Sequence, residues 1–140
     1  MPTISRWFIK AGMLWFICGL LLSVITHSAL LATVSPLLFA LKPVYYHLLF
    51  MGWITQIIIG VSIWMFPRHT KAAPQGNERV NWAIFITLNA GLLLRCVAEP
   101  LAVVNPEQLW SWSLLLSACL QICAGGLYVV NIWPRVKRKT

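Results

Sequence analysis

The stretch HLLFMGWITQIIIGVSIWMFPR, residues 47 to 68, decides the fold class of this chain. Its apolar run is long enough for a helix to cross the hydrocarbon core of a bilayer, which takes about 20 residues. Pro67 then stops the helix, and Arg68 anchors its end at the interface. The stretch nevertheless opens on His47 and carries Gln56 near its middle. A helix that only had to sit in lipid would need neither side chain, so each requires a partner or a function.

The composition of the whole chain agrees with this interpretation. Of its 140 residues, 59% are hydrophobic and 10% are charged, and the mean hydropathy is +0.77. A soluble domain is usually about 45–50% apolar and about 25% charged. A net charge of +8 could indicate a protein that binds nucleic acid. The basic residues, however, lie between apolar runs, where they determine membrane topology. We therefore expect a protein that contacts the lipid bilayer and binds no nucleic acid.

Four apolar runs divide the sequence, and each can span a bilayer as a helix. The spans are expected at about residues 7–33, 44–66, 80–98 and 107–133. Pro134 and Arg135 are expected to end the fourth span as Pro67 and Arg68 end the second, with the proline stopping the helix and the arginine anchoring it at the inner interface. The first run is too long for a signal peptide and lacks a clear cleavage site of small residues. We therefore predict an all-α membrane protein, a four-transmembrane-helix bundle that forms a single integral membrane domain over residues 1–140.

The basic residues indicate the orientation of the bundle. They gather at the amino terminus, after the second span and in the carboxyl-terminal tail: Arg6, Lys10, Arg68, Lys71, Arg79, Arg135, Lys137, Arg138 and Lys139. The other two loops hold Lys42 on one connection and Glu99 with Glu107 on the other. By the positive-inside rule, both termini face the cytoplasm. The expected location is a bacterial or archaeal cytoplasmic membrane, crossed several times.

Gln56 has a structural interpretation. Gly52, Gln56 and Gly60 recur every four residues, so they form one stripe along the second span. Small residues let a neighbouring helix approach closely, and a glutamine can donate a hydrogen bond across that contact. We favour interhelical packing over a ligand or proton role for Gln56.

The four cysteines fall inside apolar segments and form no CxxC pair. They are interpreted as reduced apolar residues: Cys18, Cys96, Cys119 and Cys123.

Three cationic or titratable side chains are expected at a similar depth. His47 begins the outer end of the second span, and His27 lies about 20 residues, or about 30 Å, into the first. Arg95 approaches the same outer level in the third span. Haem is commonly held by histidine nitrogen, and its propionates need cationic partners. Each of these residues also has a simpler interpretation. His47 could lie at the membrane interface, and His27 could bond to a backbone carbonyl one turn back. Arg95 could snorkel to the interface or pair with Glu99.

The same region carries a family resemblance. His47-x3-Met51, Gly60, the Trp64-x-x-Pro67 ending and the following NWAIFITLNAGLLLR, residues 81–95, resemble the second and third helices of the haem–copper oxidase subunit I superfamily. They are closer still to small four-helix membrane proteins similar to that subunit. The His…Gly…Pro and Gly…Arg pattern is also similar to the helices of NnrS-type haem–copper membrane proteins, which are linked to nitric oxide stress.

The resemblance covers residues 44–100 and implies a role for one residue. In subunit I, a histidine near the outer end of the second helix ligates the low-spin haem, which implies an axial-ligand role for His47. The spacing from His47 to Pro67 is shorter than in that family, and the sequence has no tandem histidine pair for copper. A full catalytic subunit has about twelve helices. We therefore expect neither a copper site nor reduction of oxygen or nitric oxide by this chain alone.

Two functions follow as hypotheses. In the first, the chain binds haem b for electron transfer or a redox or gas response in a respiratory context. His47 is then an axial ligand, His27 or a histidine of another protomer is the second, and Arg95 neutralises a propionate. In the second, the chain is a haem-free structural or assembly subunit that docks against larger respiratory-complex subunits or a second copy. A transporter or channel is disfavoured because the spans lack mid-membrane carboxylates and broken helices.

Overall fold

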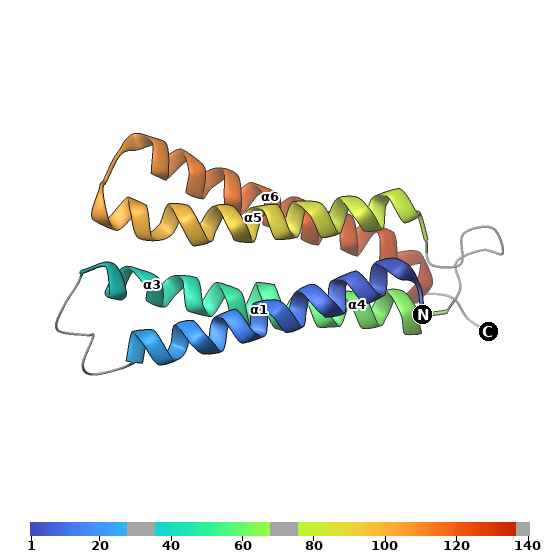
Figure 1. Ribbon diagram of the computed structural model, residues 1–140. Helices are drawn as coiled ribbons and strands as arrows, with labels where there is room; N and C mark the ends of the chain where they lie inside the picture. The colour runs from blue at the N-terminus through green and yellow to red at the C-terminus, as the bar shows by residue number, and fades with distance from the viewer. Residues whose placement is uncertain (28–35, 68–75, 137–140) are drawn as a thin grey trace.

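The computed structural model describes residues 1–27, 36–67 and 76–136, and these residues are helical apart from short ends and turns. The elements in chain order are α1 (Thr3–His27), α3 (Pro36–His47), the π-helix η1 (Leu48–Thr55), α4 (Gln56–Met65), α5 (Glu78–Val104) and α6 (Gln108–Val136). The segments α3, η1 and α4 follow one another without a break and form one long rod (Figure 1). Four stretches are long and apolar enough to cross a membrane: Thr3–His27, Ala40–Met65, Glu78–Val104 and Gln108–Val136. The predicted four-helix membrane architecture is confirmed.

The helices run as two antiparallel pairs (Figure 1). One pair consists of α1 and the α3–η1–α4 rod, and the other consists of α5 and α6. With four crossings, the first residues of α1 and the last turn of α6 lie at the same end of the bundle, as the prediction of two termini on one side requires. The cytoplasmic assignment of that end stays a prediction from the basic residues.

Two helices continue past the expected ends of their spans. The third span was expected to end near residue 98, but α5 continues through Pro100 to Val104. Pro134 was expected to stop the fourth span, but it lies inside α6, which continues to Val136. A proline removes one backbone hydrogen bond, and neighbouring groups can compensate for that loss in a membrane helix. The expected part of the first span beyond His27 lies outside the described residues.

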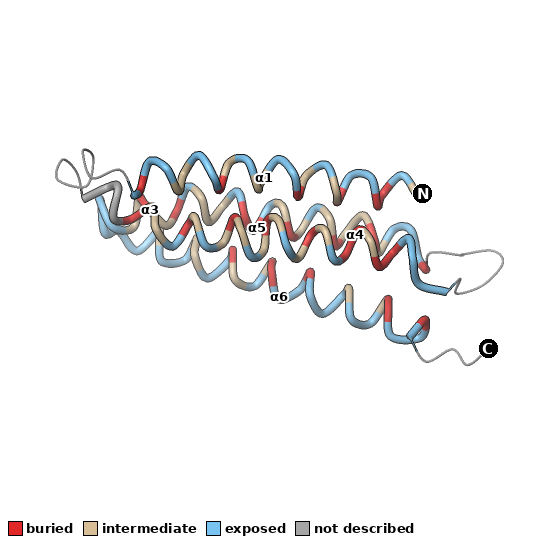
Figure 2. Tube along the Cα trace, turned by 90° about the horizontal axis from the view of Figure 1, so that it is seen from below, coloured by how far each residue is buried: buried red, intermediate tan, exposed pale blue. Residues whose placement is uncertain are grey.

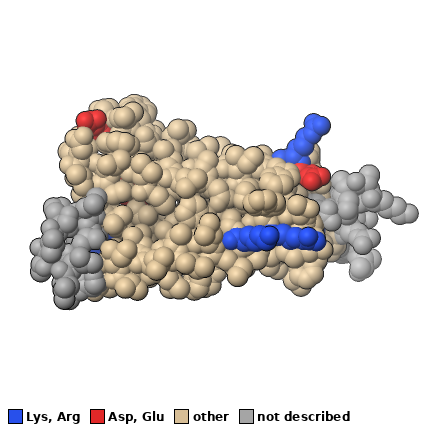
Figure 3. Space-filling view, viewed as in Figure 1, with Lys and Arg blue, Asp and Glu red and all other residues tan. Residues whose placement is uncertain are grey.

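The bundle is apolar on its outside as well as between its helices. Large apolar side chains on the outer faces are exposed, among them Val130 at 74% and Ile122 at 73%. The buried residues instead follow the sides on which the helices meet (Figure 2), with Phe8, Ile63 and Leu88 at the centre. In the view of Figure 3 most of the surface between the two ends is uncharged, apart from one basic side chain that lies along it. This pattern suits helices whose outer faces contact lipid chains.

Glycines allow the closest approach of α1 to the second span. A Cβ built at Gly52 would lie 2.8 Å from Trp15 Cβ, and one built at Gly60 would lie 2.9 Å from Phe8 Cβ. Real Cβ atoms essentially never show contacts this short, so a larger residue would force the helices apart. The predicted packing role of this glycine stripe is confirmed.

Candidate functional site

His47 is the last residue of α3 and stands where the helix changes from α to π geometry. Its Nδ1 lies 2.9 Å from the carbonyl oxygen of Pro43, one turn earlier. A carbonyl can only accept, so the Nδ1 atom carries the proton and donates it. In the neutral imidazole the other nitrogen, Nε2, is then left with a free lone pair. This is the form of histidine that can ligate a metal.

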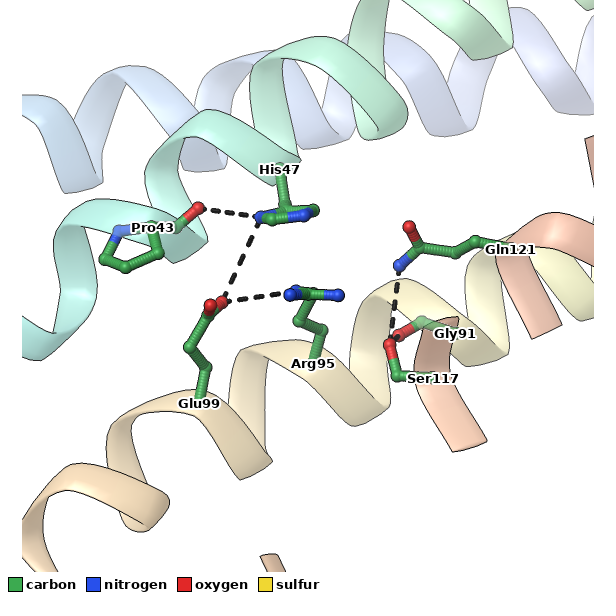
Figure 4. A network of polar contacts seen from close by, with 7 residues as sticks. All are labelled: Pro43, His47, Gly91, Arg95, Glu99, Ser117 and Gln121. Atoms are coloured by element: carbon green, nitrogen blue, oxygen red, sulfur yellow. Dashed lines mark hydrogen bonds and ion pairs between the residues drawn. The ribbon is translucent and has the colours of Figure 1, made fainter. Parts of the chain in front are cut away.

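A carboxylate and a guanidinium of α5 lie beside this ring (Figure 4). Glu99 Oε2 is 4.0 Å from His47 Nδ1 and 3.4 Å from Arg95 Nε. The side chains of Glu99 and Arg95 are 14% and 21% exposed. Among the described residues, neither Glu99 Oε2 nor Arg95 Nε has a partner with hydrogen-bond geometry. The open alternative for Arg95, its pairing with Glu99 one turn on, is confirmed.

A small pocket opens on the outside of the second span next to His47. Its volume is about 130 Å³, and it is lined by Tyr46, His47, Phe50 and Met51. Sites that enclose a whole ligand usually measure about 300–1,000 Å³. All four lining residues belong to one helical rod, so the pocket is an open depression on one helix and does not by itself enclose a ligand.

His27 lies apart from this site. It is exposed at the end of α1, and its Nδ1 is 3.0 Å from the carbonyl oxygen of Ser23, one turn back. Its ring meets Tyr45 edge-on, with 6.1 Å between the centroids. Tyr45 and His47 are two residues apart on one helix, so they project on nearly opposite sides, about 200° apart. The structure brings His47 and Arg95 to one carboxylate and leaves His27 against the other side of α3.

The cysteines add no ligands to this region. Within residues 1–27, 36–67 and 76–136, no group of three or more His, Cys, Asp or Glu side chains is arranged to hold a metal ion. All four cysteines are free, and Cys119 and Cys123 are exposed on α6. The described residues therefore offer His47 no set of further protein ligands for a metal ion.

Comparison with known families identifies the chain. The model of the family described as NnrS protein matches residues 4–139. The chain belongs to the NnrS family. No curated protein and no solved structure matches it. The predicted NnrS resemblance is confirmed and extends well beyond residues 44–100, whereas the finer resemblance to oxidase subunit I stays a prediction.

The NnrS chain also contains a polar network that the sequence only hinted at. Asn89 Oδ1 accepts hydrogen bonds from Trp15 Nε1 at 2.8 Å and from Gln56 Nε2 at 3.0 Å. Its own Nδ2 donates to the carbonyl oxygen of Phe85 at 2.8 Å. Three helices, α1, α4 and α5, meet at this one amide. The packing role predicted for Gln56, which is fully buried, is confirmed, and its partner is Asn89.

Arg135 has a different role from the one predicted. We expected an anchor at the inner interface, but the side chain is 2% exposed. It donates to the carbonyl oxygens of Phe66 at 2.7 Å and of Ile63 and Pro67 at 3.0 Å each. These carbonyls belong to the end of the second span, where a helix has no backbone donors left for them. Arg135 of α6 therefore caps α4.

Proposed function

We propose that this NnrS-family membrane protein binds haem b through His47. The observation that supports this proposal most directly is the hydrogen bond from His47 Nδ1 to the Pro43 carbonyl. It orients the ring and leaves the lone pair of Nε2 unused, and His47 itself lines an open, mainly apolar pocket. Metal-ligating histidines nearly always donate their other nitrogen to a carbonyl or a carboxylate in this way.

The residues present fit one side of a haem. His47 offers a neutral imidazole nitrogen, and Tyr46, Phe50 and Met51 form an apolar wall beside it. Arg95 supplies a cation in the same region, although Glu99 already holds it. When bound, haem supplies one-electron chemistry or gas binding at its iron. The protein positions the ligand and excludes water from one face.

The sixth coordination position decides the kind of function. His27 contacts Tyr45 and Ser23 on the other side of α3, so the described geometry favours a ligand from outside this chain. A histidine of a second protomer would produce a six-coordinate haem suited to electron transfer. An open sixth position would produce a five-coordinate haem suited to a gas response. The two cases differ in spin state and therefore in visible spectrum.

A haem-free assembly subunit is the second candidate function. The observation that favours it is the outer face of α6, where a Cβ at Gly125 or Gly126 would meet nothing within 4 Å. Glycine-lined faces of membrane helices commonly receive another helix. This candidate predicts co-purification with larger membrane proteins and no effect of His47→Ala on that association.

The test is a visible spectrum of the chain purified in detergent after expression with adequate haem. We expect a Soret band that His47→Ala abolishes and that His69→Ala, a histidine outside the predicted site, leaves unchanged. His27→Ala should also leave the band unchanged, because its ring faces away from the pocket. Absence of the band from the wild-type protein, or its persistence in His47→Ala, would refute the proposal.

A further inference from the structure

Glu99 is the carboxylate of this chain that most needs an explanation. The chain has three acidic residues. Glu78 is the first residue of α5 and Glu107 immediately precedes α6, and both are exposed. Glu99 lies inside the α5 span with its side chain 14% exposed. An ionisable group at membrane depth is costly and usually marks a functional site.

Glu99 lies beside the same His47 nitrogen that donates to the backbone. Two acceptors face the same His47 nitrogen: the Pro43 carbonyl oxygen at 2.9 Å and Glu99 Oε2 at 4.0 Å. The first accepts the hydrogen bond from Nδ1–H, and the second places a negative charge on the same side of the ring (Figure 4). Both favour a proton on Nδ1 and leave Nε2 as the lone-pair nitrogen. At 4.0 Å the carboxylate makes no hydrogen bond to the ring, so it acts on the imidazole through its negative charge.

Arg95 completes the arrangement by offsetting the charge of Glu99. Its Nε is 3.4 Å from the carboxylate oxygen that faces His47. Both atoms are buried and lack hydrogen-bond partners among the described residues, so the pair interacts mainly by charge. Such an interaction acts over several ångströms in a medium of low dielectric constant. The electrostatic potential at the His47 ring therefore depends on both charges.

We propose that Glu99 is a positioning residue for His47, and that the Arg95–Glu99 pair sets how strongly Nε2 binds ferric rather than ferrous haem iron. The second part rests on the proposed haem function, whereas the first concerns the histidine alone. The negative charge favours the ferric state, which carries the greater positive charge. Arg95 acts in the opposite direction, so the two charges together hold the reduction potential at an intermediate value.

Three variants separate these effects. Glu99→Gln removes the negative charge and leaves Arg95 uncompensated, so ferric haem should bind roughly tenfold more weakly. If ferrous binding is unchanged, this tenfold change raises the one-electron midpoint potential by about 59 mV. Arg95→Gln should shift the potential in the opposite direction. The double variant Arg95→Gln/Glu99→Gln should return close to the wild-type potential, because it removes both charges.

The control variants test for loss of structure. Glu99→Asp keeps the charge and should retain most of the wild-type behaviour. Glu78→Gln removes the same charge 21 residues earlier on α5, about 32 Å away along the helix axis, and should change nothing at His47. A misfolded Glu99→Gln protein would be detected by size-exclusion chromatography. Arg95→Gln, whose potential should shift in the opposite direction, would then provide the test.

A measurement on haem-free protein separates this inference from the proposed function. The ¹⁵N resonances of the His47 imidazole report which nitrogen carries the proton, with or without haem. We expect Nδ1 to be protonated in the wild type and the Nδ1 resonance to shift in Glu99→Gln but not in Glu78→Gln. If the wild type binds no haem but the resonance shifts, the haem function fails and the positioning role stands. An unshifted resonance in Glu99→Gln refutes the positioning role, and an unshifted potential refutes the redox role.

Discussion

Replacing Asn89 by leucine tests the polar junction in the middle of the bundle. The change keeps the approximate shape of the side chain and removes the oxygen on which Trp15 and Gln56 converge. Interhelical hydrogen bonds in membrane proteins average about 0.6 kcal/mol and reach about 1.7 kcal/mol. Loss of two such bonds should therefore lower the free energy of unfolding by about 1–3 kcal/mol. Because Gln56 is fully buried, its amide finds no water to replace the lost partner.

The assay is reversible unfolding in mixed micelles, with Thr87→Val as the matched control. Thr87 lies on the same helix, but its hydroxyl bonds to carbonyls of its own helix, those of Ala83 and Ile84. We expect Thr87→Val to be nearly neutral. In a double-mutant cycle, Gln56→Leu/Asn89→Leu should cost less than the sum of its single changes, because the two residues share their bonds. An Asn89→Leu protein as stable as Thr87→Val would refute the role of Asn89 as the junction of three helices.

Two further predictions concern packing and capping. Gly52→Leu should destabilise the bundle by roughly 1–3 kcal/mol because its side chain would collide with Trp15, whereas Gly125→Leu, which enters open space, should be tolerated. Thermal unfolding in detergent measures both, and equal melting temperatures would contradict the close contact. Arg135→Leu removes the donors to three carbonyls at the end of the second span, bonds worth about 1.5–3 kcal/mol each when the donor is charged. Hydrogen exchange of the Phe66 amide should therefore accelerate, with Lys137→Leu as the charge-matched control; unchanged exchange would show that Arg135 does not cap α4.

The parts of the fold that depend on length and hydropathy could be predicted from the sequence. The run from residue 47 to residue 68 is long, apolar and interrupted every four residues by glycine or glutamine, which was enough to predict both a span and its packing face. The residues with which Gln56 and Gly52 interact could not be predicted. Asn89 and Trp15 lie on other helices, and a single sequence does not specify which sides of two helices meet.

The candidate site also shows that a single sequence does not specify which sides of two helices meet. Counting residues from the membrane surface estimated the depth of His27 and His47, because each helical residue rises by about 1.5 Å. Depth does not determine rotation about the helix axis, and the contacts of His27 and His47 lie on different sides of α3. The π-helix after His47 was also unforeseen. Its Thr55 hydroxyl donates to the Phe50 carbonyl five residues back, and no periodicity in the apolar residues signalled that change.

Arg135 illustrates a third source of difference. Its place in a basic tail after a proline is typical of an interfacial anchor, and the same Pro-Arg pair ends the second span. In the folded chain it reaches the unpaired carbonyls of another helix and is buried there. Helix ends always leave carbonyls without backbone donors, but the residue that bonds to them depends on tertiary structure.

The haem content of the purified chain tests the role of His47 most directly. The pyridine haemochrome assay measures haem b per protein chain in the wild type and in His47→Ala. We expect one haem per chain if the iron is five-coordinate, or one per two chains if a second protomer supplies the other ligand, and essentially none in His47→Ala. Equal haem content in the two proteins, or no haem in either, would contradict the assignment of His47 as the ligand.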